Sequence, residues 1–180
     1  MPKLDLDTIE STNRTGYPPP FDRPVQGRWY KRLGPAGGLT AFGVSQVVLK
    51  PGAWSSQRHW HAGEDEFLVM LAGEGLLVDD AGEHVLRPGD CAAFPMNDRN
   101  GHHVQNRGEA DCIFIVVGAG ANDGGDYPDI DMAFTPEGTY VHKDGTPYQT
   151  KRVPYAGAVS YFSITQGSSC AASTHACIQG

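Results

Sequence analysis

Short apolar runs separated by turn-forming residues dominate the middle of the chain. Seven segments rich in Val, Leu, Ile and Phe are predicted to be strands: Thr40–Leu49, Glu66–Leu71, Gly75–Val78, His84–Leu86, Cys91–Phe94, His102–Asn106 and Asp111–Val117. Turns rich in Gly, Pro and Asp separate them, and no stretch of helical periodicity lies between. Strands that recur about every ten residues predict an all-β fold, an antiparallel sandwich or barrel.

The segments on either side of this region differ in composition. Residues 1–39 contain the proline run GYPPPFDRP, which favours extended backbone and predicts an N-terminal arm. Residues 40–118 are predicted to form the barrel. The glycine-rich hinge GAGANDGGD opens residues 119–180, where aromatic residues alternate with turns before a small, polar tail. We therefore expect one domain with an arm at one end and a C-terminal wrap over the barrel surface at the other.

Charge and composition limit the classes of partner. The chain has 14 Lys and Arg against 21 Asp and Glu, a net charge of −7, which disfavours nucleic acid and anionic membranes. No apolar stretch reaches the roughly 20 residues that span a bilayer, and the N-terminus lacks a secretory signal. Four cysteines without an export signal indicate a reduced, cytoplasmic setting. Cys91 and Cys112 fall in apolar runs and are predicted to be buried thiols, whereas Cys170 and Cys177 lie in the tail.

Candidate metal ligands occur in the stretch GAWSSQRHWHAGEDEFLVMLAG. His59 and His61 are two residues apart, so on a strand both side chains point to the same face. A tight turn separates them from Glu66, at the start of the next predicted strand, whose carboxylate can return to the imidazole pair. Such a set suits one divalent transition-metal ion (Zn, Fe, Mn, Ni, Co or Cu) rather than Ca or Mg. A fourth ligand must come from a distant strand, where His102 and His103 are adjacent and normally only one can face the site.

Other side chains near these candidates are given secondary roles. Gln57 shares the inward face with His59 and His61 and is the candidate substrate-binding residue. Glu64 and Asp65 precede the strand that Glu66 opens, and both are predicted to face solvent.

Here the sequence resembles the cupin superfamily. The first cupin motif, G-x5-H-x-H-x3-4-E-x6-G, is matched by Gly52, His59, His61, Glu66 and Gly73, with six rather than five residues before the first histidine. The second motif, G-x5-P-x-G-x2-H-x3-N, is matched more loosely.

Gly82 and Pro88 fit the start of the second motif, and its glycine follows the proline directly. The end of the motif is matched by His102 and Asn106, which selects His102 over His103 as the fourth ligand. His103 is then expected to point away from the metal, toward a second shell or a subunit contact.

The resemblance implies a double-stranded β-helix, the cupin jelly-roll barrel, with a metal ion inside its mouth and commonly a homodimer. The stretches PGAWSSQRHWH, NGHH, YPDID and KDGTPY are similar to a subgroup of single-domain bacterial cupins, often labelled only as cupin proteins or as candidate sugar-phosphate isomerases.

The leading functional hypothesis is a metal-dependent enzyme acting on a small polar substrate, sugar- or oxo-acid-like, by isomerase or lyase chemistry. Two alternatives stay open: an iron-dependent dioxygenase, and a non-catalytic small-molecule or metal-binding module. No cluster of Lys or Arg is evident for a phosphate, and no general base is assigned, although Tyr140, His142 and Tyr148 would reach the mouth if the wrap caps it. An enzyme should have inward titratable groups besides the ligands, whereas a binding module should have an apolar pocket.

Overall fold

The computed structural model describes residues 3–148, and almost all of its regular structure is strand. The elements, in chain order, are the 3-10 turns η1 (Leu6–Thr8) and η2 (Arg23–Val25), β1 (Arg28–Arg32), the one-turn helix α1 (Leu33–Ala36), β2 (Gly43–Leu49), β3 (Trp60–His61), β4 (Glu64–Ala72), β5 (Gly75–Asp79), β6 (Gly82–Leu86), β7 (Cys91–Phe94), β8 (His103–Gln105), β9 (Cys112–Gly120), β10 (Gly125–Tyr127), β11 (Met132–Phe134) and β12 (Tyr140–Val141).

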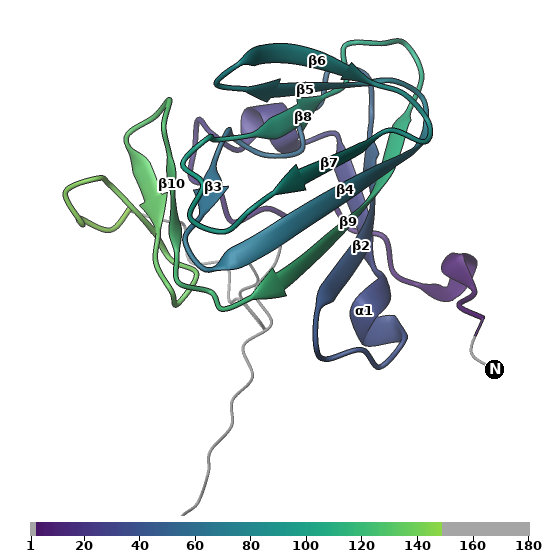
Figure 1. Ribbon diagram of the computed structural model, residues 1–180, viewed down its shortest axis with the longest axis horizontal. Helices are drawn as coiled ribbons and strands as arrows, with labels where there is room; N and C mark the ends of the chain where they lie inside the picture. Colours follow the sequence, from purple (N-terminus) through teal and green to yellow (C-terminus); the bar gives the residue numbers. More distant parts are fainter. Residues whose placement is uncertain (1–2, 149–180) are drawn as a thin grey trace, which may run out of the picture.

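Two antiparallel sheets face one another and form the jelly-roll barrel (Figure 1). The larger sheet has the strand order β1-β2-β9-β4-β7, and the smaller has the order β6-β5-β8. The apolar core lies between them: Met70 and Phe114 of the larger sheet and Leu77 and Val104 of the smaller belong to one buried cluster. This arrangement confirms the predicted all-β barrel.

The alternation along β4 shows why the sequence folds this way. Leu68 and Met70 are almost fully buried, whereas Phe67 and Leu71 are exposed on the outer face of the same strand. Side chains two residues apart share a face of a strand, so every second apolar residue enters the core. Fully burying a side chain such as Met70 stabilises the barrel by about 2 kcal/mol.

All seven predicted strands are present, and no strand end is displaced by more than three residues. The largest functional consequence is at β4, which begins at Glu64 rather than at Glu66. The turn that follows β4 requires glycine: Gly73 has a φ of +71°, and a Cβ there would lie 2.2 Å from the carbonyl oxygen of Asp111.

The N-terminal arm contributes a strand to the barrel. Its residues 28–32 form β1, which pairs along its whole length with β2 at the edge of the larger sheet. The C-terminal wrap forms a third sheet, β12-β11-β10-β3, whose last member carries a candidate metal ligand.

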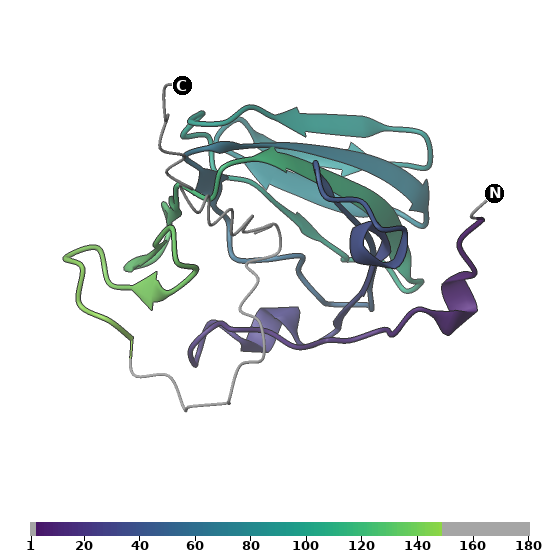
Figure 2. The ribbon, with the colours of Figure 1, turned by 90° about the horizontal axis from the view of Figure 1, so that it is seen from below.

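Arm and wrap share a second apolar cluster. Tyr17 and Val25 of the arm pack against Tyr127, Met132 and Phe134 of the wrap, and all five are buried. Figure 2 shows the arm passing beneath the sheets and the yellow-green wrap at one end of the barrel.

The cysteines are placed differently from one another. Cys112 is fully buried, as predicted, but Cys91 is exposed at the start of β7, so the prediction of a buried thiol there is wrong. A short apolar run on a sheet edge does not reveal by itself which of its faces meets the core. Cys170 and Cys177 lie outside the described residues. Among the described residues, no helix has both the length and the apolar character to cross a membrane.

Candidate metal centre

Backbone pairing between distant segments brings the candidate ligands together. His59 and His102 form an isolated antiparallel bridge, with each backbone N–H donating to the other's carbonyl oxygen at 3.2 and 2.8 Å. His61 lies on β3, which pairs with β10 of the wrap, and Glu66 lies on β4. The side chains therefore converge from three parts of the chain that only the fold brings together.

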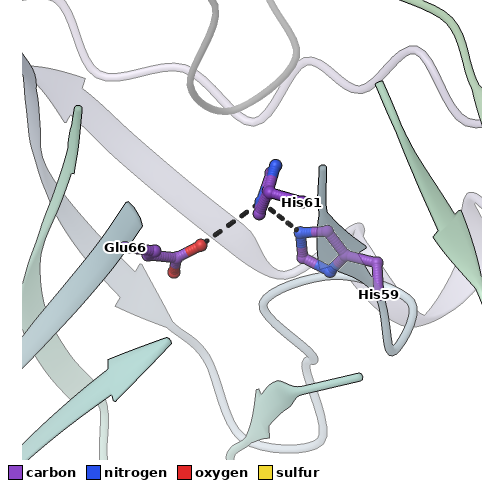
Figure 3. Close-up of side chains that lie close together, drawn as sticks. All are labelled: His59, His61 and Glu66. Atoms are coloured by element: carbon purple, nitrogen blue, oxygen red, sulfur yellow. Dashed lines mark hydrogen bonds and ion pairs between the residues drawn. The ribbon is translucent and has the colours of Figure 1, made fainter. Parts of the chain in front are cut away.

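His59, His61 and Glu66 form a compact buried group, with ligand atoms all within 4.8 Å of one another (Figure 3). The Nε2 atoms of His59 and His61 are 3.1 Å apart, and His61 Nε2 is 3.4 Å from Oε2 of Glu66. Two imidazoles and one carboxylate with their donor atoms turned toward each other can hold a transition-metal ion.

His102 contacts this group through the carboxylate. Its Nε2 atom lies 3.4 Å from Oε2 of Glu66, and its ring stacks on Phe94 with the centroids 3.6 Å apart. The ring is buried, and its Nδ1 atom has no hydrogen-bond partner among the described residues. The compact group itself contains only three of the four predicted ligands, so the role of His102 stays a prediction.

The pKa shifts of these side chains favour the protonation states that bind a cation. Burial lowers the pKa of His59 well below its usual value, and the neighbouring His61 and His102 lower it further. Burial opposes ionisation of Glu66, but hydrogen bonds from His102 and His61 outweigh it and lower the pKa of the carboxyl. Nδ1 of His59 lies 3.0 Å from the carbonyl oxygen of Gln57, which fits an Nδ1–H donor and leaves the Nε2 lone pair free for a metal.

Glu64 is a cavity residue that the sequence prediction placed in solvent. Its side chain is only 7% exposed, and its Oε2 atom lies 3.9 Å from Nδ1 of His61. Because β4 begins at Glu64, the same two-residue alternation that points Glu66 inward also points Glu64 inward. Burial and the nearby charge of Glu66 raise the pKa of Glu64 to about 9. Asp65, between them, is exposed as predicted.

A cavity of about 360 Å³ adjoins the centre, within the size range of small-molecule sites. Three of its lining residues belong to the ligand group or contact it: His61, Glu64 and His102. The other lining residues are Trp60, Leu77, Asp79, His84, Leu86, Cys91, Ala92, Ala93, Phe94, Pro95, Asp98 and Asn100.

Aromatic side chains of the wrap pack on the rings of His59 and His61. Tyr127 stacks on His59 with centroids 5.6 Å apart, and Phe134 meets His61 edge-on at 5.5 Å. Tyr17 of the arm in turn packs edge-on against Tyr127 at 5.7 Å. The wrap, backed by the arm, thus packs on the histidines with aromatic side chains that do not line the cavity.

The structure places Gln57 toward the arm. Its side-chain amide donates to the carbonyl oxygen of Phe21 at 2.8 Å, and its backbone N–H donates to the Tyr17 hydroxyl at 3.3 Å. Gln57 is buried but is not among the residues lining the cavity. This arrangement gives no support to its predicted substrate-binding role and instead fastens the arm to the segment that carries His59.

Within residues 3–148, the remaining histidines lie outside the compact group. His103 points away from it, as expected, but is buried: its Nδ1 lies 3.0 Å from the carbonyl oxygen of Ser56, and its ring packs on Trp54. His142 stacks on Tyr148 in the wrap, and neither His142 nor Tyr148 lines the cavity.

Comparison with known proteins identifies the class to which this barrel and its histidine-glutamate group belong. The family model described as the cupin domain matches residues 45–118. The crystal structure of a sugar phosphate isomerase of the cupin superfamily from Silicibacter pomeroyi is 47% identical, with a TM-score of 0.76, over 82% of this chain and 96% of that one. The chain belongs to the cupin superfamily.

Two further solved structures are similar. A candidate sugar phosphate isomerase from Acidithiobacillus ferrooxidans is 29% identical, with a TM-score of 0.57, over 63% of this chain and 74% of that one. The polyketide cyclase RemF from Streptomyces resistomycificus is 19% identical, with a TM-score of 0.53, over 66% and 79% of the two chains, and shows the shared fold alone. No curated protein matches the sequence.

Proposed function

We propose that this protein is a metal-dependent enzyme that converts a small polar substrate by isomerase or lyase chemistry. In this proposal His59, His61, Glu66 and His102 hold one divalent transition-metal ion. The relative from Silicibacter pomeroyi, named a sugar phosphate isomerase, supports the reaction class.

The observation that carries the proposal is the cavity that adjoins the ligand group and contains Glu64. A storage or binding module needs only an apolar pocket beside its ligands, whereas an enzyme needs a further titratable group that faces the substrate. Glu64 is such a group: it is buried on the cavity wall beside His61 and is separate from the compact group.

The side chains around the cavity have distinct roles in this scheme. A divalent ion, when bound, would act as a Lewis acid that polarises a substrate oxygen. Glu64 would contact a substrate oxygen or hydrogen from the cavity wall. Tyr127 and Phe134 exclude water from the parts of the histidine rings on which they pack.

A pair of neighbouring carboxylates supplies the test. Glu64→Gln should retain the metal but lose turnover by about a hundredfold or more, because the cavity loses the buried titratable group beside His61. Asp65→Asn is the matched control, since Asp65 is adjacent but exposed, and its activity should stay near the wild-type level.

The screen uses metal-loaded, tag-free protein with aldose, ketose and oxo-acid substrates, with and without O2. Turnover without O2 that depends on metal and on Glu64 supports the proposal. Turnover only with O2 would favour a dioxygenase, and ligand binding without turnover under either condition would favour a binding module. Equal activity of Glu64→Gln and Asp65→Asn would remove the role assigned to Glu64.

A further inference from the structure

The charge distribution in the cavity carries an inference about the substrate itself. The lining includes the carboxyl side chains of Glu64, Asp79 and Asp98 and, among residues 3–148, neither Lys nor Arg. From this we infer that the substrate is an uncharged, hydroxylated compound, such as a free sugar, rather than a phosphate ester. The inference rests on the proposed function, because it takes the cavity to be the substrate site.

The repulsion comes from Asp79 and Asp98, which line the cavity together with Asn100. Glu64, buried beside His61, is not counted as a charge here, because its pKa is raised to about 9. A sphere of 360 Å³ is about 9 Å across, comparable to the Debye length of about 8 Å at physiological ionic strength. A phosphate in the cavity would therefore feel repulsion from Asp79 and Asp98 that salt screens only in part.

Asp79 is held as an anion by its hydrogen bonds. One of its carboxylate oxygens accepts from the backbone N–H groups of Ala81 and Gly82 at 2.8 and 3.1 Å, and lies 3.1 Å from Nε2 of His84. The other accepts from the side-chain amide of Asn100 at 3.3 Å. An ionised acceptor of this kind suits a substrate hydroxyl, which donates a hydrogen bond, and repels a phosphate group, which is mostly a dianion at neutral pH and then offers only acceptors.

The arginines near the rim are engaged elsewhere. Arg58 is bound by the carboxylates of Asp80 and Asp129, and its side chain is only 14% exposed. Arg99 lies over the face of Trp60, 5.6 Å from the ring centroid, and is not among the lining residues. Neither guanidinium is placed as a phosphate clamp in this structure.

With a divalent ion held by Glu66, the centre would carry a net charge of about +1, which offsets only part of the repulsion from the two aspartates. Its attraction would act most strongly on the carbonyl or hydroxyl oxygens that bind the ion. The distal part of the substrate faces Asp79, Asp98 and Asn100, which favour hydroxyl groups. In this scheme one part of the substrate binds the metal through its oxygens, and the other part donates hydrogen bonds from its hydroxyl groups to the side chains of Asp79, Asp98 and Asn100.

Calorimetric titration of the metal-loaded protein tests the inference with matched ligands: fructose against fructose 6-phosphate, xylulose against xylulose 5-phosphate, and inorganic phosphate alone. The free sugar of at least one pair should bind at least about tenfold more tightly than its ester, and the difference should shrink as salt is raised. Tighter binding of both esters, or binding of neither member of either pair, would overturn the inference.

Variants at the rim connect the preference to its cause. Asp98→Asn should strengthen ester binding severalfold and Asp98→Lys should strengthen it further. Glu109→Gln and Glu109→Lys change the net charge by the same amounts as the two Asp98 variants, but at an exposed position outside the cavity lining. They should leave the ratio of free-sugar affinity to ester affinity unchanged. If the Glu109 variants shift the ratio as much as the Asp98 variants, overall charge rather than the cavity sets the preference. Loss of ester binding in Arg99→Gln would also refute the inference, because Arg99 would then be the group that binds the phosphate.

The metal titration of the same protein separates the two levels of the proposal. Absence of metal binding would reject the proposed function. Metal binding together with a preference for the esters would reject only the inference about the substrate.

Discussion

Arg58 fastens the wrap to the barrel, and its removal should measurably destabilise the protein. Its guanidinium donates to both carboxylate oxygens of Asp129 at 2.7 and 2.6 Å, to the carboxylate of Asp80, and to the carbonyl oxygen of Gly101 at 3.3 Å. Asp129 belongs to the wrap, whereas Asp80 lies in the turn between β5 and β6. One side chain therefore ties three segments together.

The size of the effect follows from the exposure of the partners. The Arg58 side chain is 14% exposed, but those of Asp129 and Asp80 are 56% and 58% exposed, so solvent screens the pairs. Exposed ion pairs contribute up to about 1 kcal/mol, and a two-pronged pair with additional hydrogen bonds contributes more. We expect Arg58→Ala to lower the unfolding free energy by about 2 kcal/mol, or the melting temperature by about 6 °C.

Thermal unfolding followed by circular dichroism measures the change in melting temperature. Arg58→Lys is the control that keeps the positive charge but loses the planar guanidinium that bonds both carboxylate oxygens of Asp129. The hydrogen bond from Arg58 lowers the pKa of Asp129, so this stabilisation is fully present above the usual aspartate pKa and is lost as the pH falls below it. The difference between wild type and Arg58→Ala should therefore shrink below about pH 4. A double-mutant cycle with Asp129→Asn that shows no coupling would refute the reasoning.

Other predictions concern the fold and the thiols. Gly125→Ala should destabilise the protein by about 3 kcal/mol or more, measured by urea unfolding, because a Cβ there would lie 2.1 Å from the carbonyl oxygen of Trp60; wild-type stability would contradict this close approach. Met70→Ala should cost about 3 kcal/mol in the same assay, since it empties a side-chain site in the core, and a loss below 1 kcal/mol would contradict the packing. Burial raises the pKa of Cys112 to about 11, so peptide mapping after iodoacetamide treatment at pH 8 should show Cys91 alkylated and Cys112 protected until the protein unfolds.

The barrel was predictable because its strands carry strong local signals. The seven apolar runs and the Gly- and Pro-rich turns between them correspond to β2 and β4–β9. The wrap and the arm were predicted only as coverings, because their structure depends on contacts between distant residues. Tyr17 and Tyr127, for example, are 110 positions apart and pack edge-on, a contact that no local periodicity encodes.

The candidate site shows the same division. The two-residue spacing of His59 and His61 and the register of the cupin motif predicted the candidate ligands. The structure brings His59, His61 and Glu66 together as a compact group, and His102 contacts Glu66. Glu64 was missed because the strand was taken to begin at Glu66, although extending the alternation back by two residues would have found it. Gln57 lies in the segment before β3, where strand alternation does not hold, and its side chain turns to the arm.

The central claim, a single metal ion held by residues from three parts of the barrel, is tested most directly by metal stoichiometry and affinity. Tag-free wild-type protein, stripped with a chelator and titrated calorimetrically with Zn, Mn, Fe(II), Co, Ni and Cu, should bind one equivalent of at least one of them. His59→Ala and His102→Ala should each weaken that binding by about a hundredfold or more. His84→Ala, which removes an exposed histidine at the cavity rim, should leave it unchanged. Unchanged metal binding in both His59→Ala and His102→Ala would contradict the site.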